Sequence, residues 1–384
     1  MSKSHLQQRP LYHLGGDFGN RTSIGFLRDV AGLNESHASF TSFIAEIPMQ
    51  EYQRFNAGTQ TILDPNESEY LLSYEGKHYL VGKLGQQQGP QAIDARGVAD
   101  RYWSSHNLIL CLNMIATLLC PKDLRAAGGY NPEANTYECV VRVATGMPVS
   151  VFTAARAEMV RQMMNGVHRF SFNGYNYVVE LEVGPVVMEG VSGLLLHGGT
   201  GKNKKAVIDC GYWSTEILRK ENGQFVRDAN AGDAIGIGMA FDYLKSTAAF
   251  DFQRELSEDE AQAILLAQAR AETLPEIKLY GKPLNAEQLG KVAEAALAVP
   301  GIPLQQMVAA RLGSARGLVA TDVDPVVFIG GSAYYLKRYV VEKVPHVRVF
   351  ADPENANARG YCLLCVGYKD WKYTTLPQAM DVAR

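Results

Sequence analysis

The chain of 384 residues is long enough for two or three domains. A hydrophobic fraction of 47% and a charged fraction of 20% allow a large buried core and exclude wholesale disorder. The formal net charge of −3 excludes a protein built around a broad basic surface for nucleic acid. No apolar run reaches the roughly 20 residues of a membrane span, and the first residues lack the apolar core of a secretory signal. With six cysteines, too few for a disulfide framework at this length, these features predict a cytoplasmic protein.

The first half of the chain predicts strands mixed with helices. Strand patterns broken by glycine-rich turns predict hairpins at residues 11–28 and 71–81. Residues 106–120 are apolar nearly all round, which predicts a buried helix. The β-branched run at 138–146 predicts a strand that is buried on both faces.

The second half continues the alternation, so an α/β fold is expected. A helix over 148–164 precedes a hairpin that turns at Asn173–Gly174, followed by a further short strand. A strand begins at 206–209, and residues 214–226 continue as a second hairpin that turns at Asn222–Gly223. The remaining predicted elements are helices over 258–274 and 285–298, a buried strand over 325–331 and an amphipathic stretch after Asn357.

A short pattern occurs twice. In each case a predicted strand ends in an aspartate with a glycine two residues later, at Asp17–Gly19 and again at Asp209–Gly211. Glycine lets the backbone turn so that several N–H groups face an anion, and a carboxylate beside phosphates requires a cation such as Mg²⁺ between them. An ordinary hairpin turn explains either loop alone. The pair favours two related halves that hold a phosphate tail from both sides.

A third motif follows the buried strand that ends at Ile329. Gly330, Gly331 and Ser332 lead into a predicted helix, and two adjacent glycines let the backbone approach a planar base or ribose.

In these three motifs the sequence resembles the actin-like ATPases of the actin, Hsp70 and sugar-kinase superfamily, and more locally the bacterial ParM-like plasmid-segregation group. The matching segments are Asp17–Ser23 for phosphate 1, Asp209–Glu216 for phosphate 2 and Phe328–Ala333 for adenosine. Further pieces in the family's order are Ala144–Pro148, Val187–Gly190 and Ala356–Gly360.

The resemblance implies an actin-like two-domain fold with a nucleotide cleft between two related halves. It implies that Asp17 and Asp209 hold Mg²⁺ through water and that Glu189 orients the attacking water. The residues implied to surround ATP or GTP are Gly19, Asn20, Arg21, Thr22, Gly211, Tyr212, Trp213, Ser214, Thr215, Gly330, Gly331 and Ser332.

Two positions depart from the family pattern. Many relatives carry a lysine where this chain has Ile24, and Arg21 is a candidate substitute for that charge. The second phosphate motif usually ends in aspartate, whereas this chain has Glu216. Both departures concern the rate of turnover more than the binding of nucleotide. For Glu189 the alternative is a solvated glutamate in a turn.

The expected domain I contains residues 1–199 with the returning segment 353–384, and domain II contains 200–352. Stretches near 34–100 and 230–315 are expected to form outer subdomains. The main hypothesis is a nucleotide-dependent filament that hydrolyses ATP or GTP and segregates plasmid DNA through a DNA-binding adaptor, without itself binding nucleic acid or membrane. The alternative is a superfamily kinase or regulatory ATPase that does not polymerise.

Three other patterns carry less weight. The segment Gly198–Lys202 lacks the first glycine and the final hydroxyl residue of a P-loop. Gly236 and Gly238 indicate a turn that opens a helix. The pair Cys362 and Cys365 lies among apolar residues, which favours buried thiols over a redox motif.

Overall fold

The structure is a computed structural model with two compact units. Unit 1 contains Met1–Gly146, Thr153–Val186 and Tyr361–Arg384, and unit 2 contains Met147–Phe152 and Val187–Gly360. Both units combine a sheet with helices, which confirms the predicted α/β class. The described residues are 9–19, 21–30, 34–58, 69–88, 100–119, 129–196, 204–279, 281–313, 322–369 and 371.

The sheet of unit 1 has the strand order β3-β2-β1-β8-β10-β9-β5-β6-β4, with β7 paired to β8. The first two strands form the predicted hairpin, and β1 also pairs in parallel with β8. The strand bounds are β1 Leu11–Phe18, β2 Thr22–Asp29, β3 Glu35–Thr41, β4 Ile44–Ile47, β5 Glu69–Tyr74, β6 Lys77–Gly82, β7 Tyr130–Asn131, β8 Thr136–Met147, β9 Gly166–Phe172 and β10 Tyr175–Met188.

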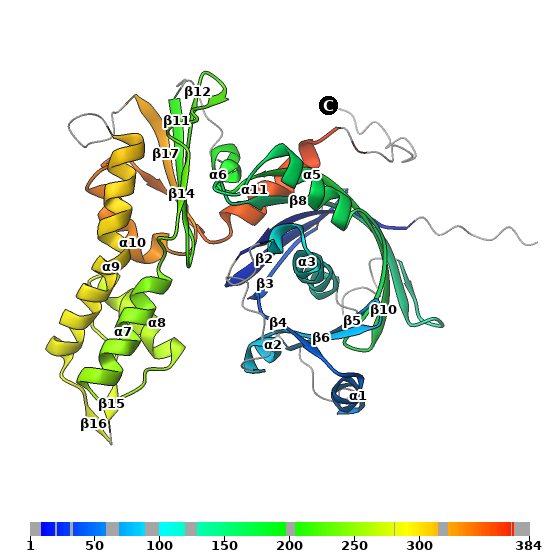
Figure 1. Cartoon of the computed structure of the whole chain (residues 1–384), viewed down its shortest axis with the longest axis horizontal. Coiled ribbons are helices and arrows are strands. Elements are labelled where there is room, and N and C mark those ends of the chain that lie inside the picture. The colour runs from blue at the N-terminus through cyan, green and yellow to red at the C-terminus, as the bar shows by residue number, and fades with distance from the viewer. Residues whose placement is uncertain are drawn as a thin grey trace, which may run out of the picture. The chain divides into compact units, whose positions relative to one another are not determined.

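This sheet is strongly curved and wraps around helix α3 (Ser105–Leu118) (Figure 1). All residues of α3 from His106 to Ala116 are buried, as predicted for a helix that is apolar nearly all round. The packing against β2 is close. A Cβ atom on Gly25 would lie 2.5 Å from Cγ of Met114, so only glycine lets the helix approach the strand.

Short helices complete unit 1. They are α1 (Met49–Gly58), α2 (Lys83–Gln87), the 3-10 turn η4 (Arg101–Trp103), α5 (Ala154–Met164) and the later part of α11 (Ala356–Gly367). In this part of α11 the thiol of Cys365 donates to the carbonyl oxygens of Leu14 and Arg142, at 3.4 Å each. The last segment of the unit is therefore packed onto the central strands β1 and β8.

The sheet of unit 2 has the order β13-β12-β11-β17-β18, with β14 paired to β12 and a separate hairpin of β15 and β16. Strands β12 and β13 form the predicted hairpin around Asn222–Gly223. Strand β11 pairs with β12 in a further hairpin and in parallel with β17. The strand bounds are β11 Lys204–Cys210, β12 Thr215–Glu221, β13 Gln224–Phe225, β14 Ala231–Asp233, β15 Lys278–Leu279, β16 Lys282–Pro283, β17 Val323–Ile329 and β18 Arg348–Val349.

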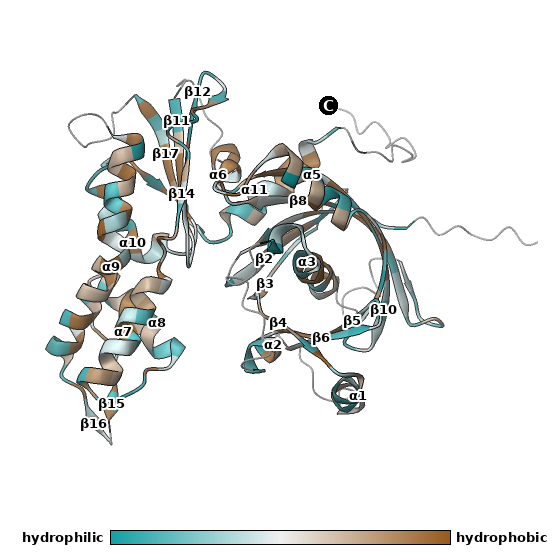
Figure 2. Ribbon diagram, in the orientation of Figure 1, coloured by the Kyte–Doolittle hydropathy of each residue, from teal (hydrophilic) through white to brown (hydrophobic). Residues whose placement is uncertain are grey.

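Helices cover both faces of this sheet. On one face a large apolar core includes Ile208, Phe328 and residues from α7 (Gly238–Asp251), α8 (Glu258–Ala269), α9 (Ala286–Leu312) and α10 (Ala333–Val341). The opposite face packs Val207 and Val327 against α6 (Val191–Leu196) and Ala356 at the start of α11. The central strands β11 and β17 therefore bury apolar residues on both faces. Figure 2 shows brown, hydrophobic residues along β17.

Helices α5 and α8 are shorter than the predicted helices over 148–164 and 258–274, and two further elements differ more. Helix α9 was predicted to end near residue 298, but it continues through Pro300 and Pro303 to Leu312. Gly301 packs so closely on Tyr339 of α10 that a Cβ atom would lie 2.4 Å from the ring. This tertiary contact outweighs the low helix propensity of glycine and proline. Strand β10 runs without a break to Met188, whereas the sequence predicted a separate short strand.

The chain crosses between the units after Gly146, Phe152, Val186 and Gly360. The expected domains, 1–199 with 353–384 and 200–352, place the crossings at 199/200 and 352/353 instead. The candidate linker near 198–205 lies mostly outside the described residues, and the domain division stays a prediction.

Candidate functional site

The hairpin of β11 and β12 places two acidic side chains together. Asp209 and Glu216 are cross-strand partners, so their side chains leave the same face of the sheet. Asp209 is 6% exposed and Glu216 is 3% exposed. Burial raises the pKa of Asp209 to about 6, and burial together with the Asp209 charge raises the pKa of Glu216 to about 8. The pair therefore holds a proton, or a cation in its place, more strongly than two exposed carboxylates would.

Both carboxylates have defined partners. The side-chain nitrogen of Asn357 donates to Oδ2 of Asp209 at 2.6 Å. The backbone N–H of Val149 donates to Oε2 of Glu216 at 3.1 Å. Glu216 also lies against Gly232, where a Cβ atom would collide with its carboxylate. At the position where aspartate is usual, the glutamate reaches a backbone N–H across the unit.

The loop after Asp209 is a tight turn. The N–H of Gly211 donates to the carbonyl of Ser214 at 2.8 Å, and the N–H of Gly238 donates to the carbonyl of Tyr212 at 2.7 Å. The second bond ties the loop to the start of α7, which begins at Gly238 as the glycine pattern predicted. Trp213 packs edge-on against the ring of Tyr212, with ring centroids 4.9 Å apart. The loop backbone is therefore fixed from two sides.

The hydroxyl of Thr215, implied by the family resemblance to face nucleotide, points into the protein. It donates to the carbonyl of Ile235 at 2.7 Å, and Thr215 is fully buried. In this structure the side chain supports the loop, and its predicted nucleotide role remains a prediction.

The motif after β17 lies beside this loop. In the parallel pairing of β11 and β17, Asp209 is opposite Ile329, so Gly330 follows directly beside the acidic hairpin. Gly330 has a φ of 87°, and a Cβ atom there would lie 2.3 Å from the carbonyl oxygen of Cys210. Only glycine combines this conformation with this approach. A Cβ atom on Gly331 would meet its nearest neighbour, Glu354, at 3.8 Å.

Ser332 joins three segments of unit 2. Its hydroxyl donates to the carbonyl of Gly211, and it accepts the N–H of Ile237 at 3.1 Å. Ser332 is fully buried. The backbone N–H of Ser332 also donates to the carbonyl of Cys210 at 3.0 Å, so this residue holds together two motifs that were predicted from separate parts of the sequence.

Glu189 lies in unit 2 at a turn between β10 and α6. Its N–H donates to the carbonyl of Met147 at 2.8 Å, and Gly190 follows with a φ of 84°. A Cβ atom on Gly190 would lie 3.6 Å from Cβ of Asp209, so the turn packs against the acidic hairpin. The structure therefore gathers Glu189, Asp209, the 211–215 loop and residues 330–332 within one unit.

The phosphate-1 motif belongs to unit 1. Asp17 is partly buried near the end of β1, opposite Ile24 of β2. A Cβ atom on Gly19 would lie 2.8 Å from the carbonyl oxygen of Thr22, which explains the glycine in this turn. Arg21 is partly buried, and its carbonyl accepts the N–H of Ser42 at 2.7 Å. Asn20 lies outside the described residues.

Sequence reasoning missed a buried, positively charged side chain beside this loop. Arg101 is 4% exposed, donates to the carbonyl of Gly19 at 3.3 Å and stacks over the ring of Tyr102. Ile24, at the position where many relatives carry lysine, is a core residue that is 7% exposed. The only sequence signal for Arg101 was its charge, because no motif surrounds it.

The cysteine pair is buried, as the sequence favoured. Cys365 is fully buried and Cys362 is 3% exposed, and burial raises the pKa of both thiols, that of Cys362 to about 11. Thiols that stay protonated are poor nucleophiles.

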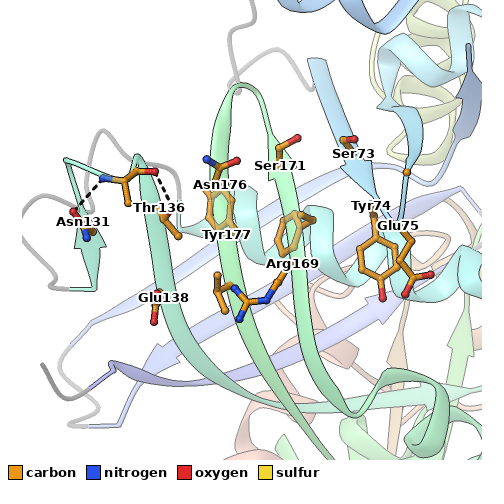
Figure 3. A pocket seen from close by; sticks show the side chains of 14 residues that line it. Ser73, Tyr74, Glu75, Asn131, Thr136, Glu138, Arg169, Ser171, Asn176 and Tyr177 are labelled. Atoms are coloured by element: carbon orange, nitrogen blue, oxygen red, sulfur yellow. Dashed lines mark hydrogen bonds between the residues drawn. The ribbon is translucent and has the colours of Figure 1, made fainter. Parts of the chain in front are cut away.

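A separate groove lies on the sheet of unit 1, with a volume of about 530 Å³. Figure 3 shows the side chains of Ser73, Arg169, Ser171 and Asn176 along it, from strands β5, β9 and β10. None of the predicted site residues lines this groove.

Two further findings concern the described residues alone. No group of three or more His, Cys, Asp or Glu side chains there is arranged to hold a metal ion directly. None of the helices resolved in these ranges combines the length and the apolar character that crossing a bilayer requires.

The two sheets each combine an Asp-x-Gly hairpin with a parallel third strand. Residues 16–191 match the family model of the actin-like protein N-terminal domain. No curated protein matches the sequence.

Solved structures with the same fold include an archaeal actin homologue in complex with ADP, with a TM-score of 0.65 and 17% identity over 93% of this chain and 99% of that one. A 15-stranded ParM filament from Clostridium botulinum has a TM-score of 0.65 and 16% identity over 93% and 99%. The apo psk41 ParM protein has a TM-score of 0.61 and 16% identity over 92% and 96%. The actin-like two-domain fold and the resemblance to ParM-like proteins, both predicted from the motifs, are confirmed.

Proposed function

We propose that this chain binds a Mg²⁺–nucleoside triphosphate, ATP or GTP, hydrolyses it and assembles into filaments in the cytoplasm. The filaments would segregate plasmid DNA through a DNA-binding adaptor protein. The proposal extends the fold and the family match to an activity, which rests on the site in unit 2.

One observation carries the proposal. Three sequence motifs that lie far apart in the chain meet where the parallel strands β11 and β17 end. The carboxyl ends of parallel strands are where α/β proteins bind ligands. Asp209, Gly330 and the turn at Glu189 are all within this edge of one unit.

The residues there suit a magnesium–phosphate group. The Asp209 carboxylate has oxygen donors of the kind that Mg²⁺ prefers, and the raised pKa of its buried group marks a place where positive charge is favourable. The Gly211 and Gly331 backbones have no side chain to block an anion.

Each residue then has a defined task. Asp209, with Asp17 from unit 1, would hold the hydrated cation, which would neutralise charge on the phosphates. The backbone of the 211–215 loop would bind phosphate oxygens, and Gly330 and Gly331 would face the nucleoside. Glu189 would accept a hydrogen bond from water and orient it in line with the terminal phosphate.

Relatives support self-assembly. Filament structures exist for a Clostridium botulinum ParM and for Alp12, both similar in fold to this chain. An open filament needs a head-to-tail contact that does not close on itself, and a specific contact buries on the order of 1,000 Å² or more. Outer surfaces near 34–100 and 230–315 are the proposed contacts.

Pelleting with ATP, GTP, ADP or no nucleotide, over a range of protein concentrations, tests the proposal. We expect a sharp critical concentration with triphosphate and none without it, because nucleotide would favour one arrangement of the two units. Phosphate release in the same samples measures hydrolysis. Hydrolysis or phosphate transfer by a monomer under every condition would favour the kinase or regulatory ATPase instead.

A further inference from the structure

Asn357 lies at the centre of a buried hydrogen-bond network in unit 2. It is the second residue of α11 and is 6% exposed. Its side-chain nitrogen donates to Oδ2 of Asp209 at 2.6 Å. Its side-chain oxygen accepts the N–H of Gly190 at 3.3 Å and the hydroxyl of fully buried Ser192. One amide group therefore connects the acidic hairpin to the turn that carries Glu189.

The orientation of this amide follows from its partners. A backbone N–H can only donate, so the atom that faces Gly190 must be the oxygen of Asn357. The NH₂ group is then directed at Asp209, whose buried carboxylate needs a donor. No other side chain of this size offers a donor and an acceptor on one planar group, because aspartate lacks the donor and leucine lacks both.

Helix α11 approaches closely enough for these bonds because of Gly360. A Cβ atom at this position, three residues after Asn357, would lie 2.4 Å from Cβ of Ser192. Positions three apart share one face of a helix, so the glycine brings that face against Ser192 at the start of α6. The packing and the hydrogen bonds thus act on the same two segments.

We propose that Asn357 is a positioning residue that holds the Asp209 carboxylate and the Glu189 turn in one fixed arrangement. The inference rests on the proposed function, in which Asp209 holds the hydrated cation and Glu189 orients the attacking water. Small errors in such an arrangement lower the rate sharply. Asn357 acts through these two residues and has no task on the nucleotide itself.

The test compares Asn357→Leu with Asn357→Ala. Leucine is close to asparagine in size, adds no charge beside Asp209 and can neither donate nor accept, so a role in packing alone would survive the change. We expect both variants to need at least tenfold more Mg²⁺ for half-maximal binding of a fluorescent ATP analogue, and to lower kcat at saturating Mg²⁺ at least tenfold. Binding measured in EDTA should change less than twofold.

Asn285→Ala is the matched control. Asn285 is also in unit 2, and its side chain accepts the N–H of Gln288 at the start of α9. Its loss should lower stability and leave the Mg²⁺ dependence unchanged. Ser192→Ala removes one of the two donors to Asn357 and should shift the Mg²⁺ dependence two- to fivefold.

Hydrogen exchange at the Gly190 amide provides a readout that needs no nucleotide. We expect at least tenfold faster exchange in Asn357→Ala, with the neighbouring Gly193 amide, which donates to the Gly190 carbonyl, unchanged. If the parent protein binds nucleotide and Asn357→Leu keeps its Mg²⁺ dependence and kcat, the positioning role is wrong. If the parent binds no nucleotide at any Mg²⁺ concentration, the proposed function fails, and the positioning role fails with it.

Discussion

The β1–β2 hairpin of unit 1 and the β11–β12 hairpin of unit 2 share one backbone plan with different chemistry. In each, an aspartate precedes a glycine by two residues and is paired across the hairpin with the residue seven positions later. That partner is Ile24 in unit 1 and Glu216 in unit 2. Both hairpins also pair in parallel with a later strand, β8 or β17.

This single cross-strand difference separates the two halves electrostatically. Asp209 faces a second buried acid, and the pair favours a proton or a cation. Asp17 faces an apolar side chain that belongs to the core of its sheet. The repeated hairpin therefore yields one half in which two buried acids favour a proton or a cation, and one half that presents a single carboxylate.

The largest effect is expected for Glu189, which lies in the turn that packs against the unit 2 hairpin. Glu189→Gln keeps the size of the side chain but weakens it as an acceptor for water. We expect kcat to fall about 100-fold, within the usual range for loss of a positioned acid or base. Nucleotide affinity should stay within twofold, since the role belongs to the transition state. Filaments, if formed, should persist longer.

Steady-state phosphate release and equilibrium binding check this prediction. Hydrolysis at the parent rate would assign the water to another residue.

A comparison of Asp209→Ala with Asp17→Ala measures which of the two aspartates contributes more to cation binding. We expect Asp209→Ala to weaken Mg²⁺-dependent nucleotide binding by well over tenfold, about 1.4 kcal/mol or more. Asp17→Ala should have the smaller effect, because Ile24 supplies no second charge. Calorimetric titration with and without Mg²⁺ measures both. Unchanged binding by a folded Asp209→Ala would remove Asp209 from the site.

Glu216→Gln isolates the second acid. In the unfolded chain Glu216 ionises near its ordinary pKa of 4.5, whereas the buried group keeps its proton to about pH 8. Between these values the folded state binds more protons, so the parent protein should lose stability as pH rises. The glutamine variant should show a flatter profile. Denaturant unfolding in EDTA between pH 5 and pH 8 measures the slopes.

Glu287→Gln serves as the control for this pH experiment, because Glu287 is an exposed residue of α9. Its profile should match that of the parent. A Glu216→Gln profile as steep as the parent's would mean that Glu216 is not the group that titrates.

Ile24→Val gives the smallest expected effect and completes the comparison. Removal of one buried methylene should cost about 0.5–1.5 kcal/mol. The loss should be equal at pH 5 and pH 8, in contrast to Glu216→Gln. Denaturant midpoints at both values decide this, and a pH-dependent loss would show that the unit 1 hairpin also senses charge.

Local patterns in the sequence predicted the hairpins, the buried helix α3 and the helix start at Gly238. They failed where distant packing decides. The sequence predicted a separate short strand after the hairpin, but β10 continues to Met188. Within it, Gly184 lies against the ring of Trp371, with room for no Cβ atom. Proline normally ends a helix, yet α9 continues because Gly301 packs on Tyr339. Neither partner can be inferred from local pattern.

In the site, too, local motifs could be predicted from the sequence, whereas contacts between distant residues could not. The sequence predicted the motifs of Asp209, Gly330 and Glu189 separately, and the structure brings all three into unit 2. Asn357 belonged to a segment that carried the family resemblance, but nothing in its neighbours indicated a bond to Asp209. Side-chain partners almost 150 positions away depend on the packing of α11, which the sequence pattern does not contain.

The return of α11 to unit 1 has a consequence for synthesis on the ribosome. Cys365 and Trp371 pack on β1, β8 and β10, so the core of unit 1 includes residues that are translated after all of unit 2. Domains usually fold in the order of their synthesis. Here the core of unit 1 can be completed only after unit 2 has been translated. We therefore expect nascent chains to acquire a native unit 2 before a native unit 1.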